Sequence, residues 1–344
     1  MFRCVLHHCC LIEAMSVRYY NPFATLFFDS HTCFLTGENL PDDTHKMSVF
    51  PSWVLTDFGY NEKRFKLMDF VSSIGYYDLQ LPCTTPVKEA FQQLDEEVYK
   101  ALQKGRAAVE ALDDHRLFLW MGKIVYGILY HDLLLEKQKC EKWKKPFGVA
   151  PRLKERLSVF HLMLQSLVKP LHFVGEKPWS ITVVSVKYSK EVFNYRDDTI
   201  QLMFALGMNG VGVIACLQDN GLVKKEQQDI LQKIGDMVLH PIQFEELCAR
   251  YFYSNYLLQP QPAYVIENRE QGMTLTTPKP AHSQSTPLFG VWDDAIFAKV
   301  LTDYWSPWGF TRKQIHDFPD PPISFLENQT DYSFITPDQI SLPY

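Results

Sequence analysis

The chain has 344 residues, of which 46% are hydrophobic and 22% are charged, and its formal net charge is −6. This length and balance fit a soluble globular protein of one large or two ordinary domains. Nucleic-acid binding draws much of its free energy from cations that displace phosphate counterions, and it normally leaves a basic excess in the sequence. The chain has no such excess, so its charge does not support a nucleic-acid partner unless folding gathers a local basic patch.

The cysteines and apolar runs bear on the compartment. Eight cysteines are spread along the chain without the spacing of a disulfide framework, so we expect a reduced cytoplasm. Residues 1–14 hold an apolar run that is too short and too interrupted by histidine for a signal peptide, and we expect a non-structural extension with Met15 as the natural start. The longest apolar run, residues 117–135, contains Lys123, which favours a buried core helix over a membrane span.

The N-terminal third predicts short elements followed by a long helix. The patterns predict an irregular strand at 18–28, a short helix at 51–58, and a hairpin of runs 65–70 and 76–81. A helix then begins near Thr85, and its apolar residues recur at steps of four and three from Val87 to Leu102. The acidic residues at 95–97 lie largely opposite this apolar face, and we expect them to be solvated rather than to bind a metal.

The middle of the chain predicts helices around a small sheet. The expected helices are 106–112, 113–139, 151–168, 226–238 and 241–258, and the expected strands are 180–186, 200–206 and 211–217. A tight turn at 208–210 joins the last two strands, so they should pair antiparallel. The helix at 113–139 is apolar around most of its circumference, which predicts a central buried helix, and Gly122 and Gly127 should let a neighbour approach closely.

The C-terminal part predicts a linker, a helix and an arm. Prolines interrupt the polar segment 259–287, where one short strand is expected at 264–266. A helix is expected at 291–304, followed by a proline-broken arm that keeps several aromatic rings. Such an arm would bury its rings on its own protein or on a partner, and we favour the first arrangement.

These elements predict an α+β fold. A ββα knuckle-like N-terminal unit at 15–105 should pack on a helix-rich body with a small antiparallel sheet at 106–258. The linker at 259–287 then leads to the C-terminal helix and extended arm at 288–344.

Two cysteines in the N-terminal unit have the setting of a metal knuckle. Cys33 opens the sequence Cys-Phe-Leu-Thr-Gly, Cys83 opens Cys-Thr-Thr-Pro before the expected helix, and Ser48 opens Ser-Val-Phe-Pro between them. This order resembles the HNH-endonuclease knuckle, a treble-clef-like ββα unit. In that family two Cys-x-x-Cys pairs hold zinc, and a His-x-x-Pro segment supplies the catalytic histidine. The stretches 120–130, 178–181 and 212–219 are similar to the downstream part of bacterial proteins that carry an intact knuckle.

Four positions of the resembled motif are changed in this chain. Thr36 and Pro86 stand where the second cysteine of each pair is expected, Ser48 replaces the histidine, and Val87 stands where an asparagine is expected. Two thiolates cannot close a tetrahedral zinc site, and serine lacks the basicity to activate water near neutral pH. The resemblance therefore implies a degenerate knuckle with no zinc, no other cofactor and no catalytic residue. In the alternative interpretation, the two cysteines are ordinary buried thiols.

We therefore expect a non-catalytic protein of HNH-nuclease-like origin that binds a protein partner, with no membrane partner. The first alternative is a divergent metal-dependent nuclease that uses other residues, such as His31, His45 and either Asp42 or Asp43. The second alternative is nucleic-acid binding without cleavage. The run at 196–198, an arginine and two aspartates, could perform acid–base chemistry, but we expect a turn with one ion pair because adjacent acids point apart in an extended chain.

Overall fold

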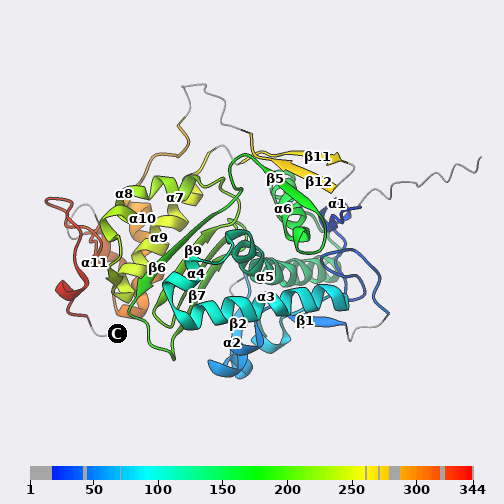
Figure 1. The fold of residues 1–344 in the computed structure, drawn as a ribbon, viewed down its shortest axis with the longest axis horizontal. Helices are drawn as coiled ribbons and strands as arrows, with labels where there is room; N and C mark the ends of the chain where they lie inside the picture. Colours follow the sequence, from blue (N-terminus) through cyan, green and yellow to red (C-terminus); the bar gives the residue numbers. More distant parts are fainter. Residues whose placement is uncertain are drawn as a thin grey trace, which may run out of the picture.

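The computed structural model describes residues 18–41, 45–69, 71–259, 262–269, 272–278, 287–317 and 322–342. The fold is α+β, as the sequence predicts, with helices on both sides of a central sheet (Figure 1). The helices are α1 Pro22–Thr25, α2 Ser52–Asp57, α3 Thr85–Lys104, α4 Arg106–Glu110, α5 Asp114–Lys142, α6 Pro151–Leu164, α7 Leu222–Glu226, α8 Gln228–Ile234, α9 Pro241–Leu257, α10 Asp294–Trp305 and α11 Arg312–His316.

The strands form one five-stranded sheet and three smaller ones. They are β1 Lys46–Ser48, β2 Arg64–Lys66, β3 Ser73–Gly75, β4 Gln80–Pro82, β5 Leu171–Val174, β6 Ser180–Val186, β7 Phe193–Asp198, β8 Met203–Met208, β9 Val211–Cys216, β10 Val238–Leu239, β11 Val265–Arg269 and β12 Gly272–Thr276. The large sheet has the order β10-β6-β9-β8-β7. Its pairs are antiparallel except for the short parallel pair of β10 with β6.

The turn between β8 and β9 follows the predicted chemistry. Asn209 and Gly210 both have positive φ angles, 46° and 79°, the backbone region that a two-residue hairpin of the native twist requires. Side chains alternate across the sheet, so Phe204 and Leu206 belong to one apolar core while Met203 and Ala205 belong to the other. Helices cover both faces, and β8 and β9 are consequently buried along their whole length.

Helix α5 is the centre of the first core, as its apolar pattern predicts. Asp113 caps its N-terminus, and Gly122 and Gly127 lie where an added Cβ would meet Leu164 and Val49 at 2.6 and 2.5 Å. By length and composition, α5 is the one helix in the described part of the chain that could cross a membrane. However, 83% of its most apolar window is buried inside the protein, which fits the predicted core helix.

The second core lies under α9 and α10, and the C-terminal arm closes it. Glu246 on α9 is fully buried and accepts hydrogen bonds from the Ser324 hydroxyl (2.7 Å) and the Phe325 amide (2.7 Å). The Gln243 amide donates to the carbonyls of Phe325 and Ile335 at 2.8 and 2.7 Å. The arm therefore docks on its own chain, the arrangement that we favoured.

Several local predictions were wrong. Asn21 caps a short helix, α1, within the segment 18–28, which was predicted to be a strand. In the predicted hairpin, β3 replaces the expected second run as the partner of β2, and residues 80–82 form β4, which pairs with β1. The segment 259–287 contains two strands, β11 and β12, and β12 pairs with β5. Long-range strand pairing decides the last two cases, and local patterns do not report it. In the first case, the Asn21 cap followed by Pro22 in the first helical turn is a local signal that the strand prediction overlooked.

Candidate functional site

The two motif cysteines lie close together in the folded chain. The Phe34 amide donates to the Pro82 carbonyl at 2.8 Å, so the residues next to Cys33 and Cys83 are hydrogen-bonded to each other. The Gly37 amide donates to the Cys33 carbonyl at 3.0 Å, and Gly37 adopts the left-handed conformation with φ at 74°. A tight turn, the antiparallel β1–β4 pair and α3 therefore surround both thiols.

Both thiols are buried and free. Burial, and then the nearby Cys33, raise the pKa of the Cys83 thiol to about 12, so it is protonated at neutral pH. Of the two residues at the missing ligand positions, Thr36 is half-buried and Pro86 is exposed. Within the described ranges, no group of three or more His, Cys, Asp or Glu side chains comes together.

Ser48, at the position of the catalytic histidine, has a buried hydroxyl. Its Oγ has no hydrogen-bond partner among the described residues. The next residue, Val49, packs against Gly127 of α5, and the His131 ring on α5 contacts the Gln80 carbonyl of β4 at 3.0 Å. Helix α5 therefore packs against the β1–β4 pair, and no macromolecular phosphate can reach the Ser48 hydroxyl without displacing neighbouring atoms.

The alternative metal ligands form no site in the described ranges. His31 is exposed, and its carbonyl accepts from the Leu40 amide at 2.7 Å. His45 is half-buried, and its carbonyl accepts from the Cys83 amide at 3.0 Å. Asp42 and Asp43 lie outside the described residues, as do residues 1–14 and Met15.

A buried ion pair beside the knuckle was missed in the sequence. Lys123 on α5 is completely buried and donates to both carboxylate oxygens of Asp95 on α3, at 2.8 and 2.9 Å. Desolvation raises the pKa of Asp95, and the attraction of Lys123 opposes that shift. The prediction that Asp95 is solvated was therefore wrong. The signal was present, because a lysine inside a buried helix needs a charged partner.

The residues at 196–198 do not form the expected turn. Arg196, Asp197 and Asp198 lie within β7, and Arg196 pairs with Glu245 of α9 at 2.9 Å rather than with a neighbouring aspartate. Burial raises the pKa of Asp197 to about 7, with further contributions from the charges of Asp198 and Asp132. This strand carries a structural ion pair between the sheet and α9.

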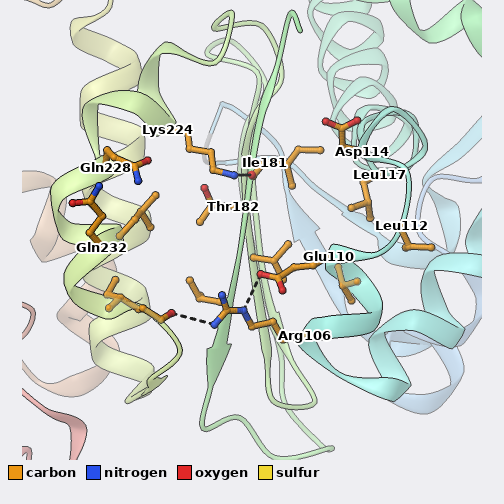
Figure 2. Close-up of a pocket in the computed structure, with 16 residues that line it drawn as sticks. Arg106, Glu110, Leu112, Asp114, Leu117, Ile181, Thr182, Lys224, Gln228 and Gln232 are labelled. Atoms are coloured by element: carbon orange, nitrogen blue, oxygen red, sulfur yellow. Dashed lines mark hydrogen bonds and ion pairs between the residues drawn. The ribbon is translucent and has the colours of Figure 1, made fainter.

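A cleft of about 370 Å³ lies at the edge of the large sheet, between α4 and α8 (Figure 2). Residues 181–184 of β6 form its floor. One wall comes from α4 and the start of α5, and the other comes from α7 and α8. The cleft is lined by Arg106, Val109, Glu110, Leu112, Asp114, Leu117, Ile181, Thr182, Val183, Val184, Lys224, Gln228, Leu231, Gln232, Ile234 and Gly235. Its volume falls within the range of small-ligand sites.

Two cations lie over the β6 edge in this cleft. The Lys224 ammonium donates to the Ile181 carbonyl at 2.7 Å. Arg106 donates from Nε to Glu110 at 2.9 Å and from Nη1 to the Gly235 carbonyl at 3.2 Å, so it connects the two walls (Figure 2). Sequence reasoning missed this cleft because its residues come from separate segments that only the tertiary fold brings together.

Asp219 holds the start of α7, the helix that carries Lys224. Its carboxylate accepts from the Ser180 hydroxyl at 2.8 Å, from the Val223 amide at 2.9 Å and from the Gly221 amide at 3.1 Å. These bonds join the first residue of β6 to the N-terminal turn of α7. Asp219 therefore has a supporting position beside the cleft.

Comparison with family models, with curated proteins and with solved structures finds no match to this chain. Arguments about function therefore rest on the geometry of the knuckle and the cleft.

Proposed function

We propose that the chain is a non-catalytic protein of HNH-nuclease-like origin that acts by binding a protein partner. The observation that carries this proposal is the buried Ser48 hydroxyl, because the position that should activate water has neither a basic side chain nor access to solvent. The residues Thr36 and Pro86 also support it, because they stand at the two remaining ligand positions and carry no thiolate for a structural zinc.

A protein partner fits the charge better than a nucleic acid does. The formal charge of the chain is −6, and lysines concentrate only at residues 137–145. Within that cluster Lys139 is paired with Asp69 at 2.6 Å, and Lys137 donates to the Phe28 carbonyl at 3.3 Å. The pair with Asp69 neutralises one of the positive charges that would bind a phosphate backbone, and the Phe28 carbonyl holds a second lysine in place.

The nuclease alternative is tested by incubating the purified chain with supercoiled plasmid and Mg²⁺ or Mn²⁺. We expect no nicking above a buffer control. Cleavage that is present in the wild-type chain and lost in His45→Ala would overturn the proposal, because it would identify a divergent metal-dependent site.

The nucleic-acid-binding alternative has its own measurement. Binding to duplex and single-stranded DNA is followed at low and high salt, because phosphate contacts produce a steep salt dependence. We expect no binding at low salt. Tight binding that weakens steeply as salt rises would favour a nucleic-acid partner over a protein.

A further inference from the structure

We propose that the cleft at the β6 edge binds an extended peptide segment, which adds as a strand beside residues 181–183 and places a carboxylate against Lys224. The proposal deepens the proposed function and rests on it only in that the chain acts by binding. The cleft and its charges do not depend on how the knuckle arose.

Residues 181–183 of β6 form a sheet edge that no strand of the described chain covers. The Val186 amide donates to Gly210, beside β9, while the Lys187 amide donates to Leu239 of β10, on the opposite side of β6. Backbone groups alternate in direction along a strand, so Ile181 and Val183 point their amides and carbonyls away from β9 and into the cleft. In the described part of the chain, β10 pairs only with Ser185 and Val186. The edge at 181–183 therefore has no strand partner among the described residues, and the side chains over it are Lys224, on the Ile181 carbonyl, and Arg106.

The two walls of the cleft offer apolar contacts to the side chains of an added strand. Successive side chains of an added strand would point to opposite faces of the sheet. On one face they would meet Val109 and Leu112, and on the other Leu231 and Ile234. Main-chain bonds to an edge with alternating apolar contacts are the recognition mode of strand addition to a sheet.

The charged side chains of the cleft favour a ligand with a carboxylate. Glu110 is bound by Arg106, and Asp114 is bound by Lys177 at 2.6 Å. Among the described residues no carboxylate lies within ion-pair distance of Lys224, whose ammonium donates to the Ile181 carbonyl. An ammonium has three N–H donors, so Lys224 can keep this bond and still donate to a ligand carboxylate. The complementary peptide is therefore acidic at the position next to Lys224.

The helices that flank the edge exclude a broad partner surface. The edge lies between the α4 wall and the α8 wall, and the bond from Arg106 to Gly235 joins these walls (Figure 2). A single extended segment would have to displace the Arg106 side chain from Gly235, whereas the edge of a second folded sheet would also collide with the helices of both walls. Lysine over an exposed edge also prevents edge-to-edge aggregation, and Lys224 serves that role when the cleft is empty.

The probes are five acetylated and amidated pentapeptides of alternating valine and threonine, with glutamate placed at each position in turn. Their matched controls carry glutamine in place of glutamate. Binding is measured by fluorescence anisotropy, and amide protection is measured by hydrogen exchange in the full chain. We expect at least one glutamate peptide to bind about tenfold more tightly than its glutamine control and to protect the amides of Ile181 and Val183.

Two variants test the assigned contacts. Lys224→Gln should weaken the best peptide about tenfold, whereas Lys225→Gln, one residue further along α7 and outside the cleft lining, should leave binding unchanged. Val183→Pro removes an outward N–H without removing a bond to β9, and it should abolish binding.

The proposal is overturned if none of the peptides binds at 1 mM peptide, on the order of the weakest useful affinity. It is also overturned if Lys224→Gln binds as the wild-type chain does, or if protection appears away from residues 181–183. These results would leave the plasmid measurement unaffected, so failure of the peptide site is distinguishable from failure of the non-catalytic assignment.

Discussion

The knuckle and the β6 cleft place their polar groups in opposite ways. In the knuckle, Cys33, Cys83 and the Ser48 hydroxyl point into packed protein, and Lys123 is neutralised by Asp95. In the cleft, backbone groups of β6 and the Lys224 ammonium line open space. A motif resemblance draws attention to the first region, but a ligand has room only in the second. Substitutions in the knuckle should therefore change stability, and substitutions in the cleft should change binding.

The largest expected effect comes from Lys123→Met. This change leaves the Asp95 carboxylate with 15% side-chain exposure and no cation, so the free energy of unfolding should fall by about 3–5 kcal/mol. Chemical denaturation followed by circular dichroism measures it. The double variant Lys123→Met with Asp95→Leu should recover most of the loss. If the single variant is as stable as the wild-type chain, the pair does not hold α5 against α3.

Asp132 should give a pH dependence to stability on the knuckle side of the molecule. It lies on α5, accepts from the Met68 amide at 2.9 Å, and has a pKa that burial raises to about 6. Because the folded state binds this proton more tightly than the unfolded state, the free energy of unfolding should fall as pH rises from about 4 to about 6. The contribution is on the order of 2 kcal/mol.

Asp132→Asn keeps an acceptor for Met68 but removes the titration. Denaturation curves between pH 4 and pH 7 should therefore be flatter for the variant than for the wild-type chain. Equal slopes in the two proteins would show that Asp132 is not the titrating group.

Gly127→Ala tests the close packing of α5 on the knuckle. The added Cβ would lie 2.5 Å from a Val49 methyl, so helix or strand must shift. Overpacking should outweigh the better helix propensity of alanine and cost about 1–2 kcal/mol. Gly148→Ala is the matched control, because nothing lies within 4 Å of its added Cβ. Thermal unfolding of both variants measures the difference, and equal midpoints would argue against a packed interface.

The smallest expected effect on stability comes from Lys224→Gln in the cleft. Its side chain is exposed and donates a hydrogen bond to the Ile181 carbonyl, so the free energy of unfolding should change by about 0.5 kcal/mol or less. A loss of several kcal/mol in the same denaturation measurement would make Lys224 a structural residue and would weaken the contrast between the two regions.

Local patterns predicted much of the fold. The spacing from Val87 to Leu102 gave the buried face of α3, and the Asn209-Gly210 turn gave the β8–β9 pair. These features succeed because periodicity and turn chemistry act between residues that are close in the chain. Strand β7 was missed because it is half-buried throughout and carries three charged residues among its six.

The candidate sites were harder to predict for a physical reason. The proximity of Cys33 and Cys83 depends on the hydrogen bond from the Phe34 amide to the Pro82 carbonyl, and the cleft depends on how α4 and α8 flank one strand edge. Both arrangements join residues that are far apart in sequence. The sequence could identify cysteines at motif positions, but it could not indicate an unpaired edge, because that depends on where the short strand β10 stops.

We propose above that the knuckle is packed structure that holds no metal. The most direct measurement is the zinc content of the untagged chain, determined by mass spectrometry after purification without chelators. We expect much less than one zinc per chain, with the same value in a Cys33→Ser, Cys83→Ser variant. One zinc per chain that disappears in the variant would contradict it.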